Sequence, residues 1–219
     1  MNAPASKHHI VISGTGRSGT TFLVQLLTHL GLDTGFSQQE AAGAGFFSDA
    51  RAGLEHDVRA YNAPYIVKSP YFCEYAEEVL RRDDIHIDHV LVPIRDLHAA
   101  AESRRYVVRS TLAGMPIADR LKFHLKPREL PGGLWRTAST RQGAQETVLL
   151  RQVYALMLAL AGYQVPVTIL RYPRLVRDSD YCFEKLRPIL GGITHLEFMG
   201  AFRECARPDL VHEFGSADG

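Results

Sequence analysis

A short apolar run that ends in a glycine-rich turn, near the start of the chain, limits the possible folds more than any other feature. Residues 9–13 (HIVIS) are rich in β-branched side chains, and residues 14–21 (GTGRSGTT) hold three glycines. Residues 18–31 then carry leucine and phenylalanine at helical spacing. β-Branched runs favour strands, and apolar residues three or four apart favour an amphipathic helix. The sequence therefore predicts a strand, a tight turn and a helix, which is how an α/β fold begins.

The same alternation of strand and helix continues along the chain. Further strands are expected at residues 65–68, 86–94 and 165–170, and further helices at 72–82, 97–109, 144–161 and 174–190. Strands that alternate with helices form a parallel sheet covered on both faces. We therefore expect an α/β, three-layer, P-loop-like fold with a central parallel sheet flanked by helices. A single domain is expected over residues 1–219, with its core over about residues 8–191 and a C-terminal tail over 192–219.

One segment does not follow this alternation. Residues 116–140 are rich in proline and glycine and contain the only tryptophan, Trp135. A high content of proline and glycine favours a loop. We expect this loop to be a lid or an acceptor-binding segment.

Composition and charge exclude several classes of protein. The 25 Lys and Arg residues nearly balance the 24 Asp and Glu residues, so no overall field attracts nucleic acid or an anionic membrane. The chain starts without the apolar core of a secretion signal and has no stretch long enough to cross a bilayer. Three cysteines lack paired spacing, and His86 and His89 lack partners at ligand spacing. We expect a cytoplasmic protein without a metal, in which the apolar residues 144–161 form either core or a homodimer face.

The turn over residues 14–21 has the composition of a phosphate-binding loop. Glycines let backbone amides turn inward, and the start of a helix adds unpaired N–H groups and the positive end of its dipole. In nucleotide hydrolases this loop carries a lysine that contacts the β and γ phosphates, and here that position is Thr20. The loop thus favours a phosphate ligand other than ATP or GTP. A plain strand-to-helix turn with a Ser or Thr cap would have a similar composition.

Three parts of the sequence, namely residues 17–21 (RSGTT), Arg95 with Ser103, and Tyr172, together resemble the sulfotransferase family that uses 3′-phosphoadenosine 5′-phosphosulfate (PAPS). Residues 17–21 (RSGTT) are similar to the loop that surrounds the 5′-phosphosulfate of the donor. Arg95 at the end of one expected strand, with Ser103 eight residues later, resembles the pair that grips the 3′-phosphate. Tyr172 matches a tyrosine near the adenine, although both acids of the family's Tyr-Glu-Asp-Leu are replaced here. The resemblance implies donor contacts from Gly16, Arg17, Ser18, Gly19, Thr20, Thr21, Arg95, Ser103 and Tyr172.

The resemblance also implies catalytic residues. Arg17 in the loop and Lys68 in YIVKSP are expected to contact the transferring group or its bridging oxygen. Cytosolic members place a histidine two residues after that lysine, where this chain has Pro70. Other members use a glutamate soon after the first helix, so Glu40 is the expected base, with Glu55 and His56 as alternatives. The glycine-rich C-terminal motif of cytosolic members is absent, and its substitutes could be Arg171, Arg174, Arg203 or Arg207.

These observations predict an enzyme that moves sulfonate from PAPS to a hydroxyl or amine of an acceptor, such as a carbohydrate or small metabolite. The basic segment Arg104, Arg105 and Arg109 is either a solvated helix face or a site for an acidic acceptor. Two other functions fit the loop. One is a nucleotide or small-molecule kinase in which Asp96 binds Mg²⁺, and the other is a noncatalytic nucleotide-binding module.

Overall fold

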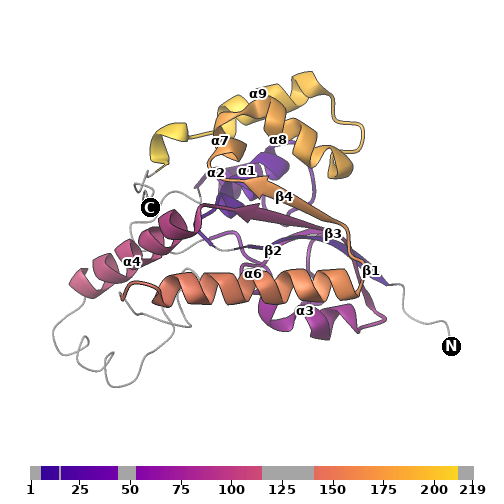
Figure 1. The fold of residues 1–219 in the computed structure, drawn as a ribbon. Coiled ribbons are helices and arrows are strands. Elements are labelled where there is room, and N and C mark those ends of the chain that lie inside the picture. The colour runs from indigo at the N-terminus through magenta and orange to yellow at the C-terminus, as the bar shows by residue number, and fades with distance from the viewer. Residues whose placement is uncertain (1–5, 15, 44–52, 115–140, 212–219) are drawn as a thin grey trace.

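The computed structural model of the 219-residue chain describes residues 6–14, 16–43, 53–114 and 141–211. The expected lid or acceptor loop over 116–140 lies outside the described residues. Four strands form one sheet in the order β2-β1-β3-β4, and all three pairings are parallel (Figure 1). The strands are β1 (Lys7–Ile12), β2 (Ile66–Lys68), β3 (Ile85–Ile94) and β4 (Val167–Arg171). The expected parallel sheet is thus confirmed.

Helices cover both faces of this sheet (Figure 1). The described helices are α1 (Thr20–His29), α2 (Gln38–Gly43), α3 (Phe72–Leu80), α4 (Leu97–Gly114), α6 (Ala144–Gly162), α7 (Arg174–Arg177), α8 (Ser179–Leu186) and α9 (His195–Cys205), with 3₁₀ turns η1 (Arg187–Ile189) and η2 (Pro208–Leu210). Successive side chains of a strand point to opposite faces. Accordingly, Ile10 and Ile12 pack in one apolar cluster with α1, α8 and α9, whereas Val11 packs in a second cluster with α3 and α6.

The C-terminal part of the core extends further than the sequence suggested. The expected tail over 192–219 is wrong for residues 195–205, which form α9. Thr194 and Glu197 form a reciprocal capping box at its start, and Phe198 and Phe202 are buried. The ring of Phe202 lies 5.6 Å from that of Phe22 in α1. These aromatic side chains pack α9 onto α1, so the core does not end near residue 191.

The long helix α6 is apolar on more than one side. Leu149, Leu156 and Leu160 are buried, so one face belongs to the core. Tyr154 and Leu158 are exposed on another face. The homodimer therefore stays a prediction. Within the described residues, no helix is long and apolar enough to cross a membrane.

Candidate functional site

Residues expected to bind the donor or to act in catalysis lie at the carboxyl ends of all four strands. The glycine-rich loop follows β1, Lys68 ends β2, Arg95 follows β3 and Tyr172 follows β4. The carboxyl ends of parallel strands lie at the same edge, so the sheet alone brings these residues together. The chain leaves β1 toward α1 on one face, while α6, which precedes β4, covers the other face. Open α/β sheets bind ligands in the crevice where the connections of neighbouring strands diverge in this way.

The loop lies tightly against the ends of β3 and β4. A Cβ atom on Gly14 would lie 2.7 Å from the carbonyl oxygen of Pro93, so no larger side chain fits there. Gly19 has a φ of 89°, and a Cβ on it would lie 3.0 Å from the ring of Tyr172. Gly19 is therefore required both by its left-handed backbone and by the close approach of Tyr172. The packing therefore constrains the loop at Gly14 and at Gly19.

The start of α1 offers hydrogen-bond donors and no competing acid. Its N-cap residue is Gly19, which supplies no side-chain cap, and its first turn contains no acidic residue. The first N–H groups of a helix have no partner within the helix, and the dipole makes this end positive. The Ser18 side chain is buried, and its Oγ has no hydrogen-bond partner in the described part of the chain. No Ser or Thr side chain caps this helix start, contrary to the alternative of a capped turn, and a helix start of this kind can bind an anion.

Two further predicted residues meet the loop from a distant part of the sequence. Arg17 Nε donates to Ser103 Oγ on α4 at 3.3 Å, across 86 residues. Arg95 donates from its guanidinium to the Arg17 carbonyl oxygen at 3.5 Å, and its guanidinium carbon lies 5.1 Å from the centre of the Tyr172 ring. Burial lowers the pKa of Arg95, although arginine stays protonated at this site. The expected loop and the expected Arg-Ser pair thus adjoin each other.

Lys68 contacts the first turn of α1. Its side chain is 0% exposed, and its Nζ donates to Thr21 Oγ1 at 3.1 Å and to the Gly53 carbonyl oxygen at 2.7 Å. Glu55 Oε1 lies 3.7 Å from this Nζ. Burial lowers the pKa of Lys68 to about 8, and burial raises the pKa of Glu55. An amine with a lowered pKa and a carboxylate with a raised pKa therefore lie beside the first turn of α1.

Glu40, the expected base, makes a different set of contacts. Its Oε2 accepts from the Ser37 backbone N–H at 2.8 Å and from the Ser37 hydroxyl at 2.7 Å. The Glu40 backbone N–H donates in turn to Ser37 Oγ at 3.2 Å. This reciprocal pair is a capping box at the start of α2. The contacts account for the exposed Glu40 carboxylate as a helix cap, and they do not connect it to the loop.

His56, the third candidate base, packs against an aromatic ring. Its ring centre lies 4.5 Å from that of Phe36, and burial lowers the pKa of the imidazole. Its backbone N–H donates to the Lys68 carbonyl oxygen at 3.2 Å. The contact anchors the segment that carries Glu55 to the end of β2. His56 therefore positions Glu55, the candidate that sequence reasoning placed second.

The basic segment of α4 is largely buried. Arg104 and Arg105 are each 2% exposed. Arg104 Nε donates to Gln145 Oε1 at 2.8 Å, and burial lowers the pKa of Arg104 to about 10. Arg105 forms ion pairs with Glu102 and Glu146, both at 2.8 Å. The expectation of a solvated helix face is wrong for these two arginines, because they join α4 to α6.

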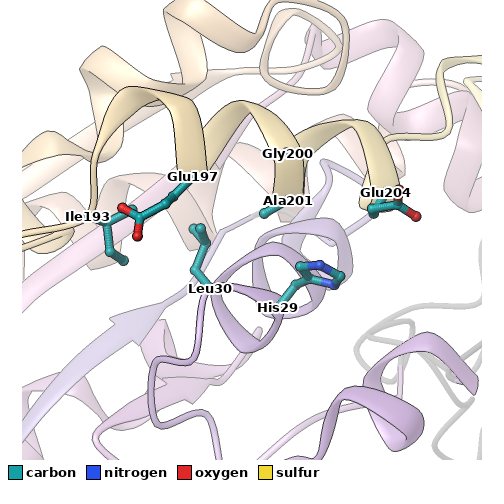
Figure 2. A pocket seen from close by; sticks show the side chains of 7 residues that line it. All are labelled: His29, Leu30, Ile193, Glu197, Gly200, Ala201 and Glu204. Atoms are coloured by element: carbon teal, nitrogen blue, oxygen red, sulfur yellow. The ribbon is translucent and has the colours of Figure 1, made fainter.

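Sequence reasoning missed Ser13, which directly precedes the first glycine of the loop. Its side chain is fully buried, and its Oγ has no partner among the residues that the structure describes. Its place between a strand and a phosphate-type loop was the available signal. A pocket between α1 and α9 contains none of the expected site residues (Figure 2). Its lining residues are His29, Leu30, Ile193, Glu197, Gly200, Ala201 and Glu204.

The chain matches no protein-family model, and a search of curated proteins finds no significant match. The function must therefore be inferred from the chemistry of the residues at the carboxyl edge of the sheet.

Proposed function

We propose that this protein is a sulfotransferase that uses PAPS, with a P-loop-like fold in which residues 14–19 form the phosphate loop. The observation that carries the proposal is the contact between Arg17 in the loop and Ser103 on α4, with Arg95 beside them. In the family that the sequence resembles, such a loop holds the 5′ end of the donor, and the residues that correspond to Arg95 and Ser103 hold its 3′-phosphate. A nucleotide with phosphate on both sides can contact both groups at once.

The local charge supports an anionic ligand. The chain as a whole has a formal net charge of only +1, so attraction must come from particular residues. Arg17, Arg95 and Lys68 all lie around the uncapped start of α1. Arginine pairs well with phosphate oxygens, and a helix start binds anions through its amides. The proposed donor contacts are those expected from the sequence, with Tyr172 beside Arg95 as the expected neighbour of the adenine.

The proposed reaction is a single displacement at sulfur. The acceptor oxygen or nitrogen forms a bond to sulfur, the bond between sulfur and the bridging oxygen of the 5′-phosphate breaks, and 3′-phosphoadenosine 5′-phosphate leaves. Arg17 and Lys68 stabilise the negative charge that develops on the sulfonate and bridging oxygens. The proton released by the acceptor goes to a carboxylate.

Glu55 fits the role of that base better than Glu40. Its carboxylate lies 3.7 Å from Lys68 Nζ, whereas the Glu40 carboxylate is held by Ser37. A base works best when its pKa lies near the working pH, and burial raises the pKa of Glu55 toward that range. The acceptor in this account is a hydroxyl or amine of a carbohydrate or small metabolite that enters beside Lys68.

The kinase alternative has less support. Asp96, its expected Mg²⁺ ligand, accepts from the Ala99 backbone N–H at 2.8 Å and so caps α4. The position of the phosphate-binding lysine is Thr20, whose side chain is buried. Among the residues that the structure describes, no specific contact favours a noncatalytic module, which would bind the nucleotide at the same loop.

Calorimetry and a transfer assay distinguish the three functions. The sulfotransferase requires 3′-phosphoadenosine 5′-phosphate to bind with 1:1 stoichiometry in the presence of a chelator, and PAPS to sulfonate an acceptor found by mass-spectrometric screening. ATP binding that depends on Mg²⁺ would instead support the kinase. Bisphosphate binding without transfer to any acceptor would support the noncatalytic module. Absence of binding by either nucleotide would overturn the proposal.

A further inference from the structure

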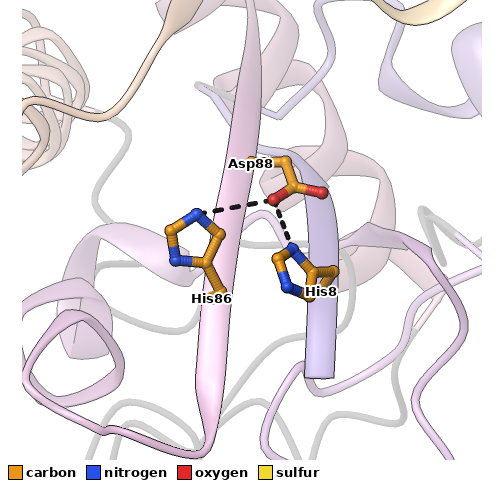
Figure 3. Close-up of side chains that lie close together, drawn as sticks. All are labelled: His8, His86 and Asp88. Atoms are coloured by element: carbon orange, nitrogen blue, oxygen red, sulfur yellow. Dashed lines mark hydrogen bonds and ion pairs between the residues drawn. The ribbon is translucent and has the colours of Figure 1, made fainter. Parts of the chain in front are cut away.

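Two histidines and an aspartate meet at the opposite end of the sheet from the proposed nucleotide site. His8 on β1 and His86 on β3 are direct partners in the parallel pairing, and their ring centres lie 4.8 Å apart. Asp88 Oδ1 lies 2.7 Å from His8 Nδ1 and 3.5 Å from His86 Nε2 (Figure 3). One ligand atom from each residue lies within 4.8 Å of the other two.

An irregularity in the strand pairing accompanies this cluster. His9 pairs with Ile87, but the next pair is Ile10 with His89, so β3 has an additional residue between them. That residue is Asp88. Such a bulge re-aims side chains and is frequent beside functional sites. The bulge therefore explains how Asp88 reaches the imidazole of a neighbouring strand.

A third segment holds the carboxylate in place. The Tyr65 hydroxyl, just before β2, donates to Asp88 Oδ2 at 3.0 Å, which leaves Oδ1 directed at the two imidazoles. Hydrogen bonds of this kind orient metal ligands and tune their affinity. The His8 and His86 side chains are 56% and 62% exposed, so an ion can enter from solvent. The arrangement has both the ligands and the support that a metal site needs.

We infer that His8, His86 and Asp88 form a binding site for a borderline divalent ion such as Zn²⁺. Two imidazoles and one carboxylate suit Zn²⁺, Co²⁺ or Ni²⁺, whereas Mg²⁺ and Ca²⁺ prefer oxygen ligands alone. The ion replaces the contacts of the imidazole nitrogens with Asp88 and draws the three ligands together, with water completing its coordination. It clamps the start of β1 to the start of β3. Six residue-to-residue steps of extended chain, roughly 20 Å, lead from His8 to Gly14 at the start of the loop, so this ion does not take part in sulfonate transfer.

The test uses the full chain without an affinity tag, freed of metal by a chelator. Titration with Zn²⁺ should show one bound ion per chain, and excess Mg²⁺ should not displace it. His86→Ala and Asp88→Asn should abolish binding, and Tyr65→Phe should weaken it roughly tenfold. His195→Ala is the matched control, because His195 forms an exposed pair with Asp180 at 2.8 Å and should leave the affinity unchanged.

A second measurement needs no variant. Zn²⁺ should protect His8 and His86 of the wild-type chain from modification by diethyl pyrocarbonate, and leave His195 as reactive as before. The bound ion should also raise the melting temperature, since it binds the folded chain in preference to the unfolded one. Equal modification of the three histidines with and without Zn²⁺, or full affinity in His86→Ala, would overturn the site. Neither result depends on nucleotide binding, so the two proposals fail or stand separately.

Discussion

The proposed chemistry depends on Lys68 at the end of β2 and on its neighbour Glu55. Glu55 gives the most direct test of the proposed general base. Replacing Glu55 with Gln removes the proposed base while keeping its size. The rate of sulfonate transfer should fall roughly 100-fold or more, as it does when a general base is lost. Donor affinity should stay nearly intact.

Glu40→Gln is the matched control for this change, because the Glu40 carboxylate is held in the cap of α2. Its transfer rate, measured with the same acceptor, should stay close to that of the wild type. A large loss in Glu40→Gln with none in Glu55→Gln would return the base to Glu40.

Lys68 gives the site a predictable pH dependence. Burial lowers its pKa to about 8 in the ligand-free chain, and a bound phosphate favours the charged amine and raises that pKa again. The affinity for 3′-phosphoadenosine 5′-phosphate should therefore fall as the pH rises through about 8, because binding then requires uptake of a proton. Calorimetry from about pH 7 to about pH 10 measures this slope. Lys68→Met should bind more weakly and lose the slope, whereas a wild-type affinity that is constant over this range would contradict the role of Lys68.

Some contacts of these residues were readable from the sequence and others were not. Ser37 and Glu40 stand three apart in SQQE, and Thr194 and Glu197 stand three apart in THLE. Both pairs match the capping-box pattern, so the cap role of Glu40 and the start of α9 could have been predicted. The proximity of Glu55 to Lys68 could not, because nothing in their spacing fixes how the intervening segment folds back.

At the scale of secondary-structure elements, α9 is the part of the fold that the expected boundaries left out. Thr194 Oγ1 accepts from the Glu197 backbone N–H, and Phe198 and Phe202 are buried. Thr194→Ala removes this cap and should lower the free energy of unfolding by about 1 kcal/mol. Urea unfolding measures the change.

Leu196→Ala provides the comparison for this prediction, because Leu196 lies in the same helix and is 81% exposed. Its effect on the free energy of unfolding should be close to zero. If Thr194→Ala changed the free energy of unfolding as little as Leu196→Ala, the cap would contribute nothing to stability.

The order of the elements was predictable because apolar patterns report burial directly. Residues 86–94 are mostly apolar, and β3 is indeed a central strand. The burial of Arg104 and Arg105 was not predictable, because it depends on Gln145 and Glu146 of α6, which lie 41 residues away. Charged residues are usually exposed to solvent, and these two arginines are buried only because α4 packs against α6.

For the molecule as a whole, the two proposed sites lie at opposite ends of one parallel sheet and differ in chemistry. The carboxyl edge carries the cationic residues around α1, and the amino edge carries the His8, His86 and Asp88 cluster. The cationic site could be predicted from the order of strands and helices, since each strand ends beside a residue that the sequence analysis identified. The cluster of His8, His86 and Asp88 could not be predicted in this way, because only the pairing of β1 with β3 brings these residues together.

If Arg95 recognises a 3′-phosphate, two nucleotides that differ only in that group distinguish the wild-type chain from Arg95→Ala. The affinities of the wild-type chain and of Arg95→Ala are measured by calorimetry, without metal, for 3′-phosphoadenosine 5′-phosphate and for adenosine 5′-phosphate. Loss of a charge-assisted hydrogen bond should weaken the bisphosphate by roughly tenfold to 100-fold. The monophosphate should bind both proteins nearly equally. Equal losses for the two nucleotides would contradict the account, because Arg95 would then not distinguish the 3′ group.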